Sequence, residues 1–261
     1  VSQVAIGGLT GIFMFTVEMT ACSNSGDVVL EYLSAQSASS SFTIGGLAGR
    51  GDITMDKCTN EGDVSAACGT AALYAGGLVG YPTGYGIFNS TNTGSVTVNA
   101  NNEEGAQYAS VYAGGCAGYS YTRIHDCTNK GAVAVTGTPT SVMTGGIAGY
   151  SNSIYDPSVP SKQAETIKNC INEGDVTSAL TEETLYAGGI AGTGFITKDC
   201  TNKGNVTTAG SKGICATGGI EGIAENNHTI SGCSNSGTIS GGVSERWTSY
   251  TGGIVGSLQY M

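Results

Sequence analysis

The chain has 261 residues, of which 43 are Gly, 11% are charged and only four are Pro. The glycines follow no Gly-X-Y period, which excludes collagen, and a 39% hydrophobic share with few prolines argues against a disordered chain. The formal net charge of −10 argues against binding to nucleic acid, because an acidic surface repels phosphate backbones.

The same composition bears on location and domain count. No run of about 18 consecutive apolar residues exists, so the sequence predicts no membrane-spanning segment. Repeats run throughout without a linker or a shift in composition, so we expect a single domain over residues 1–261. The chain begins at Val1, and we expect it to be part of a longer precursor whose signal peptide is not in the given chain.

The first recurring element along the chain is the motif Gly-Gly-x-x-Gly. Its eight copies begin at Gly7, Gly45, Gly76, Gly114, Gly145, Gly188, Gly218 and Gly252. The residue after each glycine pair is Leu, Ile or Cys. In residues 186–190, Tyr186, Gly188 and Ile190 have the same parity, so a strand of period two places them on one inward face.

The second element is the motif Cys-x-Asn-x-Gly, which alternates with the first. Its copies begin at Cys22, Cys58, Cys127, Cys170, Cys200 and Cys233, and Ser90 begins a seventh. Val or Ile follows two residues after the glycine, and acidic or basic residues occupy the opposite parity. We therefore expect Cys, Asn and Val to face inward. Nine cysteines are an odd count, and with Ser90 in the series this favours a buried ladder of free thiols over disulfides.

These short apolar positions cannot form a core within one repeat, but stacked repeats can. The sequence thus predicts an all-β fold, a right-handed parallel β-solenoid of about seven coils with three short strands per coil. A β-propeller is the alternative. Three insertions, at roughly 30–42, 99–111 and 151–165, interrupt the regular spacing and are expected to leave the coils as loops.

Three tyrosines suggest a surface for ligands. Tyr81, Tyr119 and Tyr150 each follow the last glycine of the first motif in three successive repeats. Stacked rings of this kind bind sugars or protein partners, although aromatic stacks also cover the corners of solenoids. We take these residues as the candidate ligand-binding site.

The sequence gives little sign of catalysis. It has two histidines, His125 and His228, which we expect at the surface, and neither His-Glu-x-x-His nor Gly-x-Ser-x-Gly occurs. A solenoid enzyme acting on polysaccharides needs a convergent set of carboxylates, and Asp27 and Asp63 share one outward position in neighbouring repeats. We interpret them as solvated surface groups, and we expect no metal and no cofactor.

Residues 46–49, Gly-Leu-Ala-Gly, and residues 77–80, Gly-Leu-Val-Gly, are each followed by a Cys-x-Asn-x-Gly-like strand. This arrangement resembles the GLUG-repeat family, although later copies have Ile in place of Leu. The resemblance implies a secreted or surface-attached bacterial protein, including adhesins, and carries no catalytic residues.

We therefore expect a non-catalytic structural or adhesive repeat module, secreted or on the bacterial cell surface. Its partner would be a host or cell-surface protein or a glycan. A carbohydrate-active β-solenoid enzyme and a pure spacer for another domain are the alternatives. Because no cap is recognisable at either terminus, we also expect end-to-end self-association.

Overall fold

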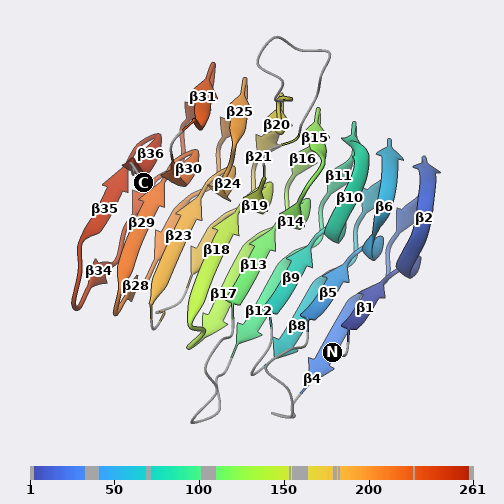
Figure 1. Ribbon diagram of the computed structural model, residues 1–261, viewed down its shortest axis with the longest axis horizontal. Helices are drawn as coiled ribbons and strands as arrows, with labels where there is room; N and C mark the ends of the chain where they lie inside the picture. The colour runs from blue at the N-terminus through green and yellow to red at the C-terminus, as the bar shows by residue number, and fades with distance from the viewer. Residues whose placement is uncertain are drawn as a thin grey trace.

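The structure is a computed structural model that describes residues 3–32, 41–68, 72–100, 110–152, 154, 164–178, 181, 183–225 and 227–258. These residues form strands and turns without a helix, and the strands stack side by side along one axis (Figure 1). The three insertions lie largely outside the described residues, which lack 33–40, 101–109 and 155–163.

Four long parallel sheets build the described solenoid, and successive coils add their strands to each sheet in turn. Sheet A contains the strands that lead into the double glycines. They are β1 (Gln3–Gly7), β5 (Ser41–Gly45), β9 (Ala72–Gly76), β13 (Ser110–Gly114), β18 (Ser141–Gly145), β23 (Thr184–Gly188), β29 (Ile214–Gly218) and β35 (Ser249–Gly252).

Sheet B contains the strands that follow the double glycines and is the largest. In the first three coils the strand is continuous, as β2 (Thr10–Thr20), β6 (Ala48–Asp56) and β10 (Val79–Phe88). In later coils it is divided, as β14 (Ala117–Ser120) and β15 (Arg123–His125), β19 (Ala148–Ser151) and β20 (Ile167–Lys168), β24 (Ala191–Thr193) and β25 (Ile196–Lys198), and β30 (Glu221–Ala224) and β31 (Thr229–Ser231), with β36 (Val255–Leu258) at the end.

Sheets C and D contain the two halves of the Cys-x-Asn-x-Gly-x-Val segment. Sheet C has β3 (Ser23–Asn24), β7 (Thr59–Asn60), β11 (Thr91–Asn92), β16 (Thr128–Asn129), β21 (Ile171–Asn172), β26 (Thr201–Asn202) and β32 (Ser234–Asn235). Sheet D has β4 (Val28–Tyr32), β8 (Val64–Cys68), β12 (Val96–Ala100), β17 (Val133–Gly137), β22 (Val176–Ser178), β27 (Val206–Thr208) and β33 (Ile239–Ser240). A short fifth sheet pairs β28 (Gly210–Ser211) with β34 (Val243–Ser244).

The predicted parallel β-solenoid is confirmed, because every strand pair is parallel and joins neighbouring coils in register. For example, Asn92 pairs with Asn60 on one side and with Asn129 on the other. Such coil-to-coil pairing excludes the propeller. Each described coil has four sides where three strands were expected, because the chain turns between Asn and Val and thus splits the predicted strand into β21 and β22 in the fifth coil.

Inside the coils, the turn at the double glycine contacts the Asn side chain on the other side, and this contact divides the core into two parts. A Cβ atom added to Gly46, the second residue of its glycine pair, would lie 2.2 Å from Cγ of Asn60, and the other coils repeat this contact. One apolar core, with Leu47, Met55 and Cys58, lies between sheets B and C, and a second, with Val64 and Ile44, lies between sheets D and A. The double glycines are therefore required by close approach.

The asparagines form the predicted inward ladder where the double glycines contact them. Each carboxamide donates one N–H to the carbonyl of the glycine two residues on, and all but the last, Asn235, donate the other to Oδ1 of the Asn in the next coil. The six coil-to-coil bonds among Asn24, Asn60, Asn92, Asn129, Asn172, Asn202 and Asn235 measure 2.8–3.0 Å. The ladder thus satisfies buried polar groups and fixes the register of the coils.

The cysteine ladder is buried as predicted, and the described cysteine side chains are free thiols. In the interior coils, Cys127, Cys170 and Cys200 are fully buried, and Ser90 occupies the same position with the same burial. The residue before each ladder position has a positive φ, between 49° and 64°. These residues are Ala21, Lys57, Asn89, Asp126, Asn169, Asp199 and Gly232. They turn the chain from sheet B into sheet C, which the sequence analysis did not anticipate.

Within the described part of the chain, no helix has the length and apolarity needed to cross a membrane.

Candidate binding surface

The three predicted tyrosines lie together on the outside of sheet B. Tyr81, Tyr119 and Tyr150 come from β10, β14 and β19 in three successive coils. The rings of Tyr81 and Tyr119 stack with centroids 5.6 Å apart, and those of Tyr119 and Tyr150 stack at 4.6 Å. The structure therefore brings the predicted residues into one continuous stack.

A second tyrosine row faces the first from sheet A. Tyr74 on β9 and Tyr112 on β13 stack on each other with centroids 5.2 Å apart. They meet Tyr81 and Tyr119 edge-on, at 5.3 Å and 5.0 Å respectively. We call Tyr74, Tyr81, Tyr112, Tyr119 and Tyr150 together the tyrosine seam, since they close the outer angle between sheets A and B.

The sequence did not predict the second tyrosine row, because residues 186–190 were expected to form one uninterrupted strand across the double glycine. Tyr186, which occupies the position of Tyr74 in a later coil, packs with Ala216 and Ile223, whereas Ile190 lies in the core between sheets B and C. The prediction that Tyr186 and Ile190 share a face is therefore wrong. The chain bends at Gly189–Ile190 as it passes from β23 into β24, so side-chain parity does not continue through the glycine pair.

The tyrosines of the seam are half-buried, and burial governs their chemistry. Burial raises the pKa of the Tyr112 hydroxyl to about 12, and it also raises the pKa of Tyr74, Tyr81 and Tyr150. The hydroxyls therefore stay neutral at physiological pH and can both donate and accept hydrogen bonds. Part of each ring is covered by its neighbours, which gives the seam a structural role as well.

The seam is hollow at its N-terminal end, because smaller residues replace tyrosine there. Thr43 is in register with Tyr74, and Ala5 is in register with Thr43. A cavity of about 250 Å³ results, lined by Gln3, Val4, Ala5, Ile12, Ser41, Thr43 and Arg50. The Arg50 guanidinium lies 4.7 Å from the centre of the Tyr81 ring and so places a cation between the seam and the cavity.

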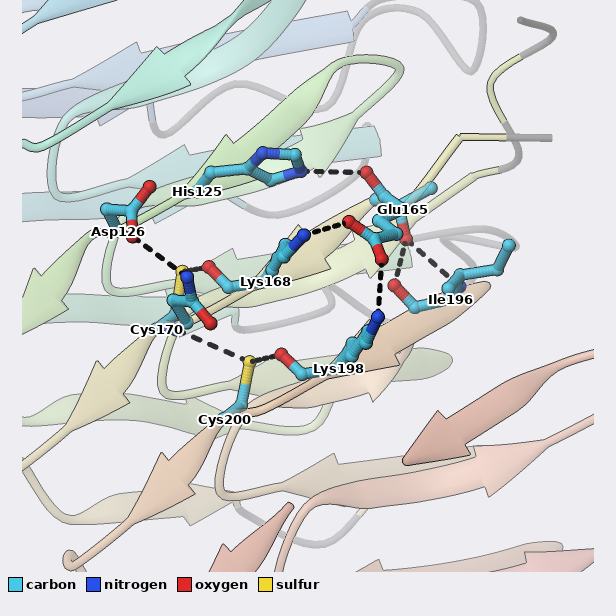
Figure 2. A network of polar contacts seen from close by, with 10 residues as sticks. His125, Asp126, Glu165, Lys168, Cys170, Ile196, Lys198 and Cys200 are labelled. Carbon is cyan, nitrogen blue, oxygen red and sulfur yellow. Dashed lines mark hydrogen bonds and ion pairs between the residues drawn. The ribbon is translucent and has the colours of Figure 1, made fainter. Parts of the chain in front are cut away.

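Figure 2 shows a charged network at the other end of the sheet B strands, around the end of the third insertion and the segments β15, β20 and β25. The Glu165 carboxylate accepts hydrogen bonds from Nζ of Lys168 and of Lys198, at 2.5 Å and 2.9 Å. These bonds hold the pKa of the Glu165 carboxyl below its usual range. The His125 ring contacts the Glu165 backbone carbonyl at 2.8 Å and not its carboxylate, so the network contains no His–carboxylate pair.

Both histidines are half-buried, which corrects the expectation of surface positions. Burial lowers the pKa of His125 and of His228. His125 packs edge-on against Phe88 with centroids 5.8 Å apart, and His228 packs against Phe195 at 5.2 Å. Each imidazole thus has a packing role beside an aromatic ring.

The acidic residues considered for catalysis have structural partners. Asp27 Oδ1 accepts the backbone N–H of Asp63 at 2.9 Å, and Asp63 Oδ1 accepts that of Ser95 at 2.7 Å. Asp175 Oδ1 accepts the backbone N–H of Asn205 in the next coil in the same way, at 2.8 Å. The aspartates thus connect one coil to the next. Among the residues that the structure describes, no three His, Cys, Asp or Glu side chains gather as a set of metal ligands.

Comparison with known proteins identifies one repeat. A family model described as the GLUG motif matches residues 71–98, which run from β9 into β12 and thus span one coil. No curated protein and no solved structure matches the chain.

Proposed function

Because the chain is a GLUG-repeat β-solenoid, we propose that it is a non-catalytic structural and adhesive module of a secreted or cell-surface bacterial protein. The observation that carries this proposal is the tyrosine seam with its hollow end. Aromatic side chains with neutral hydroxyls, aligned over several coils, suit an extended partner such as a glycan or a peptide segment of a host protein.

The cavity beside Arg50 is the part of the seam that is open to a partner. Its lining residues Thr43 and Arg50 are in register with Tyr74 and Tyr81 of the next coil, and Arg50 supplies a charge. A ring entering this cavity would continue the Tyr74–Tyr112 stack by one position. The adhesive role therefore predicts that the N-terminal end of the seam contributes most of the binding.

A glycan array and a panel of host surface proteins, probed with the purified segment, test this proposal. We expect Thr43→Tyr to fill the cavity with the residue type found in register at Tyr74, and to reduce binding about tenfold or more. Thr97→Tyr, the same exchange on an outward position of sheet D, is the matched control and should leave binding unchanged.

A spacer is the second candidate function, favoured by the way the tyrosines cover one another. A spacer holds another domain at a distance and has no ligand of its own. Failure of the segment to bind any member of either panel would support this alternative. Labelling of intact cells with antibodies against the segment tests the proposed surface location separately.

A further inference from the structure

A second cavity lies far along the solenoid, where the chain passes from sheet D to sheet A in the last coils. It has a volume of about 340 Å³, within the range of small-ligand sites. Three successive coils contribute to it, and its lining consists of Glu183, Thr184, Lys212, Gly213, Ile214, Arg246 and Trp247.

Hydrogen bonds between coils hold the walls of this cavity in place. The Ser211 hydroxyl donates to the Glu183 carbonyl at 2.8 Å and accepts the Gly213 N–H at 3.0 Å. The Ser244 hydroxyl donates to the Gly213 carbonyl and accepts the Trp247 N–H at 2.8 Å. The loop that carries Trp247 is therefore fixed against the coil beneath it.

One of the residues that line the cavity is a glycine, Gly213. A Cβ atom on Gly213 would lie 1.8 Å from the Glu183 carbonyl oxygen, so no side chain can occupy this position. Trp247, which lines the cavity from the following coil, is 70% exposed. An indole so exposed, on a loop with fixed backbone, offers an apolar face at little further cost in conformational entropy.

The charges around the cavity narrow the class of ligand. Lys212 and Arg246 both line it, although the chain has only 10 basic residues against 20 acidic ones. An arginine guanidinium matches a carboxylate in a two-pronged hydrogen bond. The Glu183 carboxylate and the Thr184 hydroxyl add hydrogen-bond acceptors, which suit the hydroxyl groups of a sugar and have no donor to accept from on a fully ionised inorganic anion.

We propose that this cavity binds an acidic monosaccharide, a pyranose ring that carries a carboxylate. Its C–H face packs on Trp247, its carboxylate pairs with Arg246 and Lys212, and its hydroxyls bond to Glu183 and Thr184. The site is separate from the tyrosine seam and does not depend on the adhesive role proposed for the seam.

The chain has a single tryptophan, so its fluorescence reports on this cavity alone. We would titrate the purified protein with glucuronate, galacturonate and N-acetylneuraminate, and in parallel with glucose, galactose and inorganic phosphate. The expected result is a saturable change with at least one acidic sugar, with a dissociation constant on the order of 1 mM. Neutral sugars and phosphate should bind at least about tenfold more weakly.

Two variants with equal loss of charge complete the test. Arg246→Gln should weaken binding of the acidic sugar about tenfold, whereas Lys130→Gln, on the turn between sheets C and D, should not change it. A flat titration with every acidic sugar would overturn the proposal. So would equal binding of neutral sugars or phosphate, or equal effects of the two variants. Thr43→Tyr in the seam should leave this signal unchanged, which separates the two sites.

Discussion

Among the described residues, Glu221 is a carboxylic acid placed entirely inside the coils. It stands in register with Ala191 on one side and Val255 on the other, so it replaces a small apolar residue. The Thr197 hydroxyl and the Gly194 backbone lie beside the carboxyl group, but neither meets its oxygens with full hydrogen-bond geometry. Burial raises the pKa of Glu221 to about 8, so the folded protein keeps this group protonated at neutral pH.

This position predicts a stability that falls with rising pH. The folded state holds a proton on Glu221 up to a pKa of about 8, while the unfolded chain releases it near 4.5. The folded form therefore binds more protons between these values, and its free energy of unfolding declines across that window by several kcal/mol at most. Denaturant unfolding at pH 5 and pH 8.5 should show a smaller decline for Glu221→Gln than for the native chain.

An exposed glutamate provides the control for this prediction. Glu173→Gln makes the same exchange of side chains at an exposed site, where the Lys203 ammonium lowers the pKa of the carboxyl. Its contribution is lost only as the pH falls towards 4.5 and below, so the slope between pH 5 and pH 8.5 should stay nearly native. An unchanged slope in Glu221→Gln would show that the group is not buried as an acid.

The cysteine ladder should tolerate serine at its buried positions. Ser90 already occupies a ladder position, where its hydroxyl donates to the Phe88 carbonyl at 2.7 Å. The Cys170 thiol makes the corresponding contact to the Lys168 carbonyl at 3.2 Å. Cys170→Ser should therefore lower the free energy of unfolding by only about 1 kcal/mol, measured in urea.

Labelling of native thiols tests the same ladder. Burial raises the pKa of the Cys127 and Cys170 thiols, which keeps them unreactive. Cys22, in the first coil, is half-buried and should react first. Fast reaction of every ladder thiol in the folded protein would contradict their inward placement.

In the asparagine ladder, each interior carboxamide bonds to the coil before it and to the coil after it. Asn129 accepts from Asn92 and donates to Asn172 and to the Gly131 carbonyl. Asn129→Ala leaves three buried polar groups without a partner, each of which costs about 1–3 kcal/mol. We expect a loss of several kcal/mol in the free energy of unfolding, seen as a lower denaturation midpoint.

Asn24→Ala is the matched control, because Asn24 lies in the first coil and is only half-buried. Water can replace its hydrogen bonds, so the loss should be clearly smaller. Equal losses in both variants would mean that the ladder does not derive its stability from burial.

Part of this strand arrangement could be predicted from the sequence. Period two placed Cys170, Asn172 and Val176 inward correctly, because outward charges alternate with them. It failed at the double glycine, where the chain bends and Tyr74 and Tyr112 emerge opposite the predicted stack. Glu221 could not be anticipated either, since its environment comes from neighbouring coils. The positive-φ corners did leave a signal, because Asn, Asp or Gly occupies five of those seven positions.

For the whole molecule, apolar exposure concentrates in the outermost coils. Met14 and Phe15 are 77% and 83% exposed in the first coil, and Leu258 is 73% exposed on β36. The strands β1 and β35 each pair on one side only among the described strands. Unpaired edges with apolar side chains favour association with another chain.

We therefore expect the isolated 261-residue segment to associate end to end as its concentration rises. Light scattering over a concentration series measures this, and Phe15→Ser should shift the association to higher concentration. Tyr85→Ser is the control, since Tyr85 is 62% exposed but lies in the third coil. A monomeric mass at all concentrations would show that the terminal coils are adequately protected by themselves.

The direction of the hydrogen bonds has a mechanical consequence. Because backbone and asparagine bonds both connect one coil to the next, tension applied between the two ends loads the coil interfaces in series. The outermost coil should peel away first, and each rupture should release one repeat of 30 to 43 residues, judged by the spacing of the double glycines. At an extended length of about 3.4 Å per residue, each step lengthens the chain by roughly 100–150 Å. The solenoid should therefore unfold one coil at a time under tension and dissipate energy at each step, which would give a sawtooth force–extension curve in single-molecule pulling.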